Sequence, residues 1–155
     1  MPESILYTAV ATSTGDGRNG HVISADGRVD LDLAMPPEMG GSGEGANPEE
    51  LFAAGYAACY HSALRAIGRR TGVDVSGSTV TAYVGIGPEG DAFDLVVTLE
   101  TDLPNVPPEQ AREVVDAAHQ VCPYSRATRG NISVELRLTG PAAAAAQPAE
   151  PAESA

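Results

Sequence analysis

Two cysteines, Cys59 and Cys122, are the residues of this chain that are best suited to covalent chemistry. Cys59 lies in an apolar run, AACYHSAL, and Cys122 directly precedes a proline in the polar and basic segment CPYSRATRG. A thiolate is a nucleophile and a metal ligand, and two thiols that meet can be oxidised to a disulfide. The residues alone leave three interpretations open, namely core packing, metal binding and nucleophilic catalysis.

Core packing and metal binding are the first two interpretations. A free cysteine in a buried helix is most often a small hydrophobic residue, although Cys122 lies at an abrupt helix end that suits packing less well. Zinc binding would need two pairs of ligands, Cys59 with His61 and His119 with Cys122. The second pair suits one helix face, but residues two apart on a helix point about 200° apart. We therefore expect His61 on a helix surface rather than on a metal ion.

Nucleophilic catalysis, the third interpretation, requires a cation near a thiolate. Burial in apolar surroundings opposes the negative charge, so a nearby positive group must stabilise it. The candidates are Arg18, in the turn GDGRNG, and Arg126 and Arg129, which follow Cys122. Composition alone does not select one of them.

The segment that carries Cys59 is predicted to be a long helix. Asn47 can cap it, Pro48 suits the first helical position, and Gly72 suits the C-terminal end. No charged residue interrupts residues 51–64. A helix that is apolar on all faces is normally buried, in a core or at a two-fold interface, so we expect this helix to be the central element.

The rest of the chain combines β-patterned segments with a second helix. Strand patterns cover residues 4–14, both sides of Asp26-Gly27, both sides of Pro88-Glu89-Gly90, and residues 131–138. A helix that begins at Pro107-Pro108 must end before Pro123. The order of three strands, helix, two strands, helix and strand predicts an α+β fold.

Composition and charge limit the partners and the location. Nine Lys+Arg and twenty-one Asp+Glu give a net charge of −12, which disfavours nucleic acid and anionic membrane surfaces. No apolar run reaches about 18 residues, and the N-terminus lacks a signal-peptide pattern, so we expect a soluble, cytoplasmic protein. We expect one domain over residues 1–139 and a disordered Pro/Ala/Glu tail over residues 140–155.

Two motifs closely resemble those of the OsmC/Ohr family. They are NPEELFAAGYAACY around the first cysteine and HQVCPYSRATRGNI around the second, and the resemblance extends over about residues 4–139. The VCPYS form is similar to that of the organic hydroperoxide resistance (Ohr) branch. The resemblance implies an α+β intertwined homodimer in which strands, arranged as a β-meander and hairpins, wrap around two central helices.

The resemblance implies a thiol peroxidase that reduces alkyl and fatty-acid hydroperoxides to alcohols, an antioxidant role in the response to oxidative stress. Cys59 would be the peroxidatic cysteine that becomes a sulfenic acid, and Cys122 would be the resolving cysteine that forms a disulfide with it. The resemblance implies no bound cofactor. Dihydrolipoyl groups of a lipoylated protein would act as the external reductant. His119 would be structural or would aid Cys122.

The resemblance also assigns roles to two charged residues. Arg18 matches the arginine that stabilises the thiolate, and Glu49 matches the carboxylate that orients this arginine through a bidentate pair. On one straight helix Glu49 lies about 15 Å from Cys59, too far for one site. Either residues 47–55 bend back, or Glu49 or Arg18 comes from a second subunit. Glu49 also suits the first turn of a helix as a partner of its dipole.

Four aromatic residues near the cysteines are expected to bind the organic part of the substrate: Phe52, Tyr56, Tyr60 and Tyr124. Burial of an alkyl group would favour bulky hydroperoxides over hydrogen peroxide. Ordinary core packing is the alternative role of these rings. The alternative functions are an OsmC-type peroxidase with a different substrate range, a non-catalytic protein that binds a hydrophobic ligand, and a zinc-stabilised domain.

Overall fold

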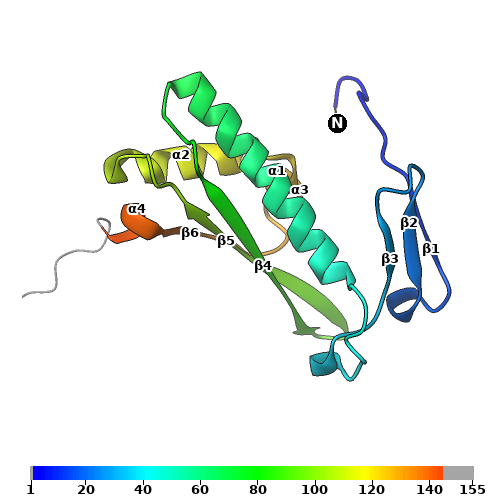
Figure 1. Cartoon of the computed structure of the whole chain (residues 1–155). Coiled ribbons are helices and arrows are strands. Elements are labelled where there is room, and N and C mark those ends of the chain that lie inside the picture. Colours follow the sequence, from blue (N-terminus) through cyan, green and yellow to red (C-terminus); the bar gives the residue numbers. More distant parts are fainter. Residues whose placement is uncertain (1, 145–155) are drawn as a thin grey trace, which may run out of the picture. The chain divides into compact units, whose positions relative to one another are not determined.

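The computed structural model describes residues 2–144 and has the α+β organisation predicted from the sequence (Figure 1). The chain divides into two compact units, Met1–Leu51 and Phe52–Ala155, which we describe separately. The single domain expected over residues 1–139 stays a prediction. No helix in the described residues is long and apolar enough to cross a membrane.

The first unit is built on an antiparallel sheet whose strands pair in chain order, which is the predicted β-meander. Its strands are β1 (Ala11–Thr14), β2 (His21–Ser24) and β3 (Asp30–Asp32), and two 3-10 turns, η1 (Gly17–Asn19) and η2 (Pro37–Met39), lie between and after them. The hairpin turn at Asp26-Gly27 is confirmed, with Gly27 at a φ of 70° and the Ser24 hydroxyl donating to Asp26 at 2.6 Å.

The strand predicted over residues 4–14 is confirmed only from Ala11 onward. The register of β1 and β2 pairs Ala11 with Ser24, after which β2 enters the turn. Within residues 2–144, the chain before Ala11 forms no strand pair, although Val10 accepts the backbone N–H of Ala25 at 2.9 Å. The side chains of Ile5 and Leu6 are accordingly exposed, at 70% and 96%.

The helix α1 (Pro48–Thr71) begins and ends where the sequence predicts. Asn47 accepts the backbone N–H of Glu50 at 2.9 Å, and the Glu50 carboxylate accepts the N–H of Asn47 at 3.2 Å, a reciprocal capping box. Gly72 follows the helix at a φ of +73°. Because α1 is continuous, the first of the two alternatives for Glu49, in which residues 47–55 bend back, is wrong.

The second unit contains a sheet in which an antiparallel hairpin is extended by a parallel strand. The elements are β4 (Thr79–Glu89), β5 (Ala92–Asp102), α2 (Pro108–Val121), α3 (Pro123–Thr128), β6 (Val134–Thr139) and α4 (Gly140–Ala144). The predicted hairpin is confirmed, but Pro88 and Glu89 continue β4. β6 pairs with β5 in parallel, so α2 and α3 form the crossover between them. Pro123 ends α2 as predicted and also starts α3, which the sequence did not predict.

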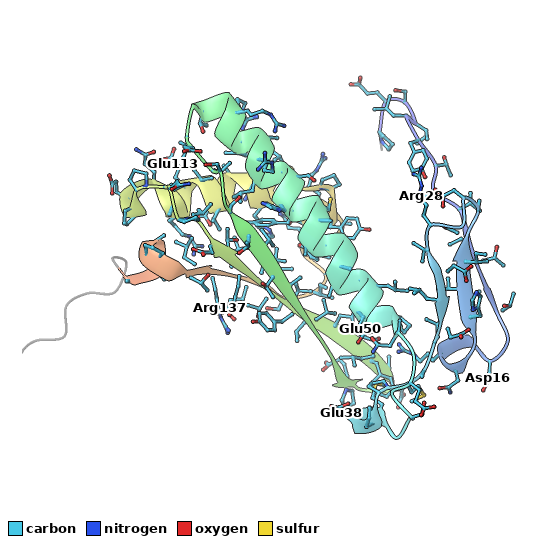
Figure 2. All side chains as sticks on the ribbon, viewed as in Figure 1. Asp16, Arg28, Glu38, Glu50, Glu113 and Arg137 are labelled. Atoms are coloured by element: carbon cyan, nitrogen blue, oxygen red, sulfur yellow. The ribbon has the colours of Figure 1, made fainter. Side chains whose placement is uncertain are left out.

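One face of this sheet packs against α1 and α2 to form the core. On β5 Val97 and Leu99 are buried, whereas Val96, which directly precedes Val97 and points to the other face, is 57% exposed. The buried core residues on α1 and α2 are Tyr56, Tyr60, Ala63, Leu64, Ile67, Ala111, Val114, Val115 and Ala118. On the outer surface Glu113 of α2 and Arg137 of β6 are exposed (Figure 2).

The apolar stretch of α1 is not buried on all faces in the single chain. Ala54 and Ala58, which lie one turn apart, are exposed. The prediction of complete burial within the chain is therefore wrong for this side of the helix, and the alternative, burial at an interface between subunits, stays a prediction.

The predicted tail differs from the expectation over its first five residues. Gly140–Ala144 form α4, and Ala142 is fully buried in the core. Alanine has the highest helix propensity and little side-chain entropy to lose, which explains why this apolar, alanine-rich stretch can be ordered. Residues 145–155 of the predicted tail lie outside the described residues.

Candidate active site

The two cysteines face each other in the second unit. Both thiols are reduced, and their Sγ atoms are 3.7 Å apart, although 63 positions separate them in the sequence. A disulfide bond joins sulfur atoms at about 2.05 Å, so a small approach of the two side chains is sufficient to form it. The arrangement brings together the two residues that the sequence singled out for thiol chemistry.

Backbone geometry at the end of α2 directs Cys122 toward α1. A residue before a proline is restricted away from the helical region, and Cys122 has a φ of −62° and a ψ of 125°. Its N–H still donates to Ala118 at 2.9 Å, while its sulfur accepts the backbone N–H of Ser125 at 3.5 Å. Cys122 thus ends α2 and caps α3, and its side chain is fully buried.

The surroundings of Cys59 favour the neutral thiol. Burial raises the pKa of the Cys59 thiol; a hydrogen bond from the backbone of Tyr124 acts in the opposite direction, and the neighbouring Cys122 adds to the increase. A reaction through the thiolate therefore needs a further positive group beside the sulfur.

Two of the four predicted aromatic contacts are fully enclosed. The Tyr56 hydroxyl donates to Ser125 Oγ at 3.0 Å and is 3.1 Å from Thr128 Oγ1, and the Tyr60 hydroxyl donates to the backbone oxygen of Val115 at 2.9 Å. Both tyrosines have no exposed surface, and burial raises the pKa of Tyr60. Their enclosure favours the core-packing alternative for these two rings.

The other two aromatic residues present accessible surface. Phe52 is half-buried and Tyr124 is 39% exposed, and their ring centroids lie 6.2 Å apart. Both rings also contact Tyr56, with centroid distances of 5.9 Å for Phe52 and 5.7 Å for Tyr124. Their role in substrate binding stays a prediction.

Arg18 and Glu49 form a bidentate ion pair within the first unit. The two guanidinium nitrogens donate to the two carboxylate oxygens at 2.9 and 2.8 Å. The hydrogen bonds from Arg18 lower the pKa of Glu49, so the carboxylate is ionised at neutral pH. Arg18 lies in η1 and Glu49 in the first turn of α1, and the pair fixes the plane of the guanidinium group. Its role toward Cys59 stays a prediction.

The other candidate cations have different contacts. Arg129 donates to the backbone oxygen of His119 at 2.9 Å, and Arg126 is exposed. In the described part of the chain, neither guanidinium group forms a hydrogen bond with a cysteine sulfur. These contacts do not select one of the three arginines as the cation.

The four residues of zinc-ligand type do not gather. His61 Nε2 is 3.0 Å from Ser78 Oγ, while burial and the charge of Arg129 lower the pKa of His119, whose buried Nδ1 has no hydrogen-bond partner. Within residues 2–144, no three His, Cys, Asp or Glu side chains are placed to hold a metal ion.

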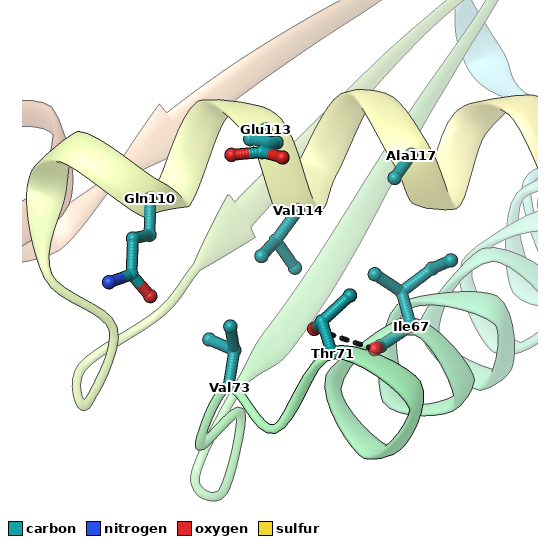
Figure 3. A pocket seen from close by; sticks show the side chains of 7 residues that line it. All are labelled: Ile67, Thr71, Val73, Gln110, Glu113, Val114 and Ala117. Atoms are coloured by element: carbon teal, nitrogen blue, oxygen red, sulfur yellow. Dashed lines mark hydrogen bonds between the residues drawn. The ribbon is translucent and has the colours of Figure 1, made fainter.

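A cavity of about 220 Å³ lies away from the cysteines, between α1 and α2 (Figure 3). Ile67 and Val114 contribute apolar walls, and the Thr71 hydroxyl donates to the backbone of Ile67 at 2.9 Å. Neither cysteine lines this cavity, so it is not the place of the thiol chemistry.

Ser125 and Thr128, whose hydroxyls contact that of Tyr56 in the core next to Cys122, were not predicted as site residues from the sequence. One signal was available. Ser125 is three residues after Cys122, the spacing at which a helix-capping side chain accepts a backbone N–H, and Pro123 suits the first helical position between them. A short helix starting at Pro123 could have been predicted from this spacing.

Comparisons with known proteins identify similar chains. The family model for OsmC-like protein matches residues 41–137, which include both cysteines and Glu49. The organic hydroperoxide resistance protein of Xanthomonas axonopodis pv. citri is 48% identical over 139 residues, which cover 88% of this chain and 97% of that protein. The protein OhrB of Bacillus subtilis is 42% identical, covering 86% of this chain and 98% of that protein. The crystal structure of an organic hydroperoxide resistance protein from Legionella pneumophila has a TM-score of 0.84 and 43% identity, covering 88% of this chain and 100% of that one.

Proposed function

The chain belongs to the OsmC-like family, in the branch of the organic hydroperoxide resistance proteins, and on this premise we propose that it is a cysteine-based peroxidase that reduces organic hydroperoxides. The observation that carries the proposal is the 3.7 Å contact between the Cys59 and Cys122 sulfur atoms. Two thiols in contact supply both electrons that the cleavage of one peroxide bond consumes.

The reaction begins at Cys59, the more accessible of the two thiols. Its thiolate attacks the distal oxygen of the hydroperoxide, so that a sulfur–oxygen bond forms and the oxygen–oxygen bond breaks. The alkoxide that leaves takes up a proton and becomes the alcohol. Cys59 is left as a sulfenic acid.

Cys122 completes the oxidation. Its thiolate attacks the Cys59 sulfur, a disulfide forms, and the hydroxide that leaves is protonated to water. A dihydrolipoyl dithiol of a lipoylated protein then attacks the disulfide and is itself oxidised, which returns both cysteines to thiols. No bound cofactor takes part in this cycle.

Arg18, held by Glu49, supplies the positive charge that the half-buried Cys59 thiol needs. Glu49 and Cys59 lie on one continuous helix at positions about 15 Å apart along its axis, so the pair acts from a second subunit of a homodimer. The exposed Ala54 and Ala58 on α1, and the exposed Leu6 in the first unit, support an interface between subunits.

Phe52 and Tyr124 favour organic substrates over hydrogen peroxide. Their accessible rings have centroids 6.2 Å apart and can bury the alkyl or aryl part of a hydroperoxide. Hydrogen peroxide has no such part, so it gains nothing from these rings.

The test is peroxide consumption by the purified protein with dihydrolipoamide as the reductant, using cumene hydroperoxide and hydrogen peroxide. We expect the wild type to consume cumene hydroperoxide faster than hydrogen peroxide, and we expect Cys59→Ser to consume neither. Cys122→Ser should complete one turnover and then stop, because it cannot form the disulfide that the dithiol reduces. Equal rates for both peroxides would point to a different substrate range. A folded wild-type protein that consumes neither peroxide would contradict the proposal and would leave binding of a hydrophobic ligand as the function to examine.

A further inference from the structure

The helix α3 is connected to α1 by a buried chain of hydrogen bonds that ends on a cysteine. Tyr56 of α1 donates from its hydroxyl to Ser125 Oγ, and the backbone N–H of Ser125 donates to Cys122 Sγ. Thr128 adds a second contact to the same hydroxyl at 3.1 Å. All three hydroxyl-bearing side chains are at least nine-tenths buried, so these bonds do not compete with bulk water.

Tyr56 is placed to align the two cysteines. It precedes Cys59 by three residues on α1, so the two side chains lie on neighbouring positions of one helix face. The sulfur atoms of Cys59 and Cys122 are 3.7 Å apart. Cys122 Sγ accepts a hydrogen bond from the backbone of Ser125, and Ser125 Oγ accepts one from the Tyr56 hydroxyl. The path from Tyr56 through α3 therefore returns to the sulfur next to Cys59.

Packing between Gly55 and Tyr124 brings α3 close to α1 at the same place. A Cβ atom at Gly55 would lie 3.0 Å from the Tyr124 hydroxyl and 3.2 Å from its ring, so the absence of a side chain permits this approach. Aromatic packing is less directional than a hydrogen bond, so this ring contact by itself does not fix the orientation of α3. The directional hydrogen bond from the Tyr56 hydroxyl to Ser125 fixes the orientation of α3.

The length of α3 makes it dependent on such contacts. A helix of six residues is far too short to be stable by itself, so its position is fixed by tertiary interactions. We propose that Tyr56 is a positioning residue that holds Ser125, and with it Cys122, in line for attack on the oxidised Cys59. This proposal rests on the proposed function.

The step that depends on Tyr56 is the second one of the cycle. The Cys122 thiolate attacks the sulfur of the Cys59 sulfenic acid, the sulfur–sulfur bond forms, the sulfur–oxygen bond breaks, and the hydroxide released is protonated to water. Intramolecular attack depends steeply on the alignment of the reacting atoms. The first step involves only Cys59 and the peroxide, so a loss of alignment at Cys122 leaves it unchanged.

The experiment compares Tyr56→Phe with Tyr60→Phe, a matched control. Both tyrosines are fully buried on α1, and each substitution removes one hydroxyl, but the Tyr60 hydroxyl bonds to the backbone of α2 rather than to α3. Reduced protein receives one equivalent of cumene hydroperoxide in the presence of dimedone, which traps sulfenic acid, and mass spectrometry follows the disulfide and the Cys59 adduct. For Tyr56→Phe we expect disulfide formation to be roughly tenfold slower, with an adduct in its place, and unchanged peroxide consumption in the first turnover. Tyr60→Phe should stay within about twofold of the wild type, since it leaves α3 in place.

A second variant keeps the test decisive if Tyr56→Phe does not fold. Ser125→Ala retains the N–H that bonds to Cys122 but removes the oxygen that Tyr56 reaches, so it should slow disulfide formation to the same degree. The double variant should be no slower than either single one, because both remove the same link. Equal disulfide rates in Tyr56→Phe and Tyr60→Phe, or a Ser125→Ala rate equal to that of the wild type, would overturn the proposal.

A separate measurement without peroxide distinguishes failure of the proposed peroxidase activity from failure of the proposed alignment by Tyr56. The reduced and disulfide forms are equilibrated with glutathione redox buffers, which measures the effective concentration of one cysteine toward the other. Tyr56→Phe should lower this effective concentration about tenfold, and Tyr60→Phe should leave it within about twofold of the wild-type value. A wild type that consumes no peroxide but shows this difference would reject the peroxidase and retain the alignment by Tyr56, whereas equal effective concentrations would reject the alignment.

Discussion

The cysteine pair and the Arg18–Glu49 pair are positioned in opposite ways. Cys122 is fully buried at the junction of α2 and α3, and its partner Cys59 lies in the middle of α1. The side chain of Arg18 is 38% exposed and lies in a 3-10 turn of the first unit, where a bidentate ion pair orients it. The first pair depends on core packing, and the second depends on charge and hydrogen-bond geometry.

This difference separates two requirements of the proposed chemistry. Packing brings the sulfur atoms together but raises the pKa of Cys59, which opposes its reaction. An ion pair in a turn adds little to stability, yet it presents a fixed positive charge. We therefore expect core substitutions to act on stability and sulfur alignment, and charge substitutions to act on the rate of thiolate attack.

The largest effect on stability should come from Leu64→Ala in α1. Leu64 is fully buried, and removing its side chain leaves a cavity in the core of the second unit, so the free energy of unfolding should fall by about 2–5 kcal/mol. Urea denaturation measures it. Val96→Ala, on the exposed face of β5, is the control and should change the free energy of unfolding by about 0.5 kcal/mol or less. Similar losses for both variants would contradict the description of the core.

Arg18→Lys should separate charge from geometry. Lysine keeps the positive charge but lacks the planar fork that bonds both oxygens of Glu49, so the rate of Cys59 oxidation by cumene hydroperoxide should fall roughly tenfold. Stopped-flow kinetics measures this rate, with Arg28→Lys, an exposed arginine of the first unit, as the control. An unchanged rate at Arg18→Lys would show that the orientation of the guanidinium group is not required.

The smallest effect should be the pH dependence that Glu49 gives to the first unit. Its folded pKa is below the ordinary value of 4.5, so its contribution to stability is present above that value and is lost as the pH falls through the lower folded pKa. Unfolding should be compared at several values between about pH 3 and pH 7 for the wild type and Glu49→Gln. The difference between the two proteins should shrink on acidification. A difference that is constant over this range would argue against an ionised pair.

Local sequence signals predicted the elements that depend on neighbouring residues. Asn47 and Pro48 located the start of α1, Asp26-Gly27 located a hairpin turn, and Pro123 located the end of α2. These features follow from the backbone preferences of a few consecutive residues. The two cysteines were also identified from the types of their neighbours.

Other features could not be predicted because they depend on contacts distant in sequence. The parallel pairing of β6 with β5, and the bond from Tyr56 to Ser125, join residues that the local pattern does not relate. Residues 4–10 have the strand pattern, but in the described part of the chain only Ala11–Thr14 form β1, so pattern alone overestimated this strand. Tyr56 and Tyr60 are fully buried, whereas Phe52 and Tyr124 are not. All four residues are aromatic, so residue type alone could not predict this difference.

The most direct test of the central claim is to count free thiols after adding one equivalent of cumene hydroperoxide to the reduced protein, with Cys59→Ser as the control. The account predicts rapid loss of both thiols to an intramolecular disulfide in the wild type, faster than with hydrogen peroxide, and no loss in the variant. Unreactive thiols in folded wild-type protein would contradict it, and would leave the 3.7 Å sulfur contact as core packing.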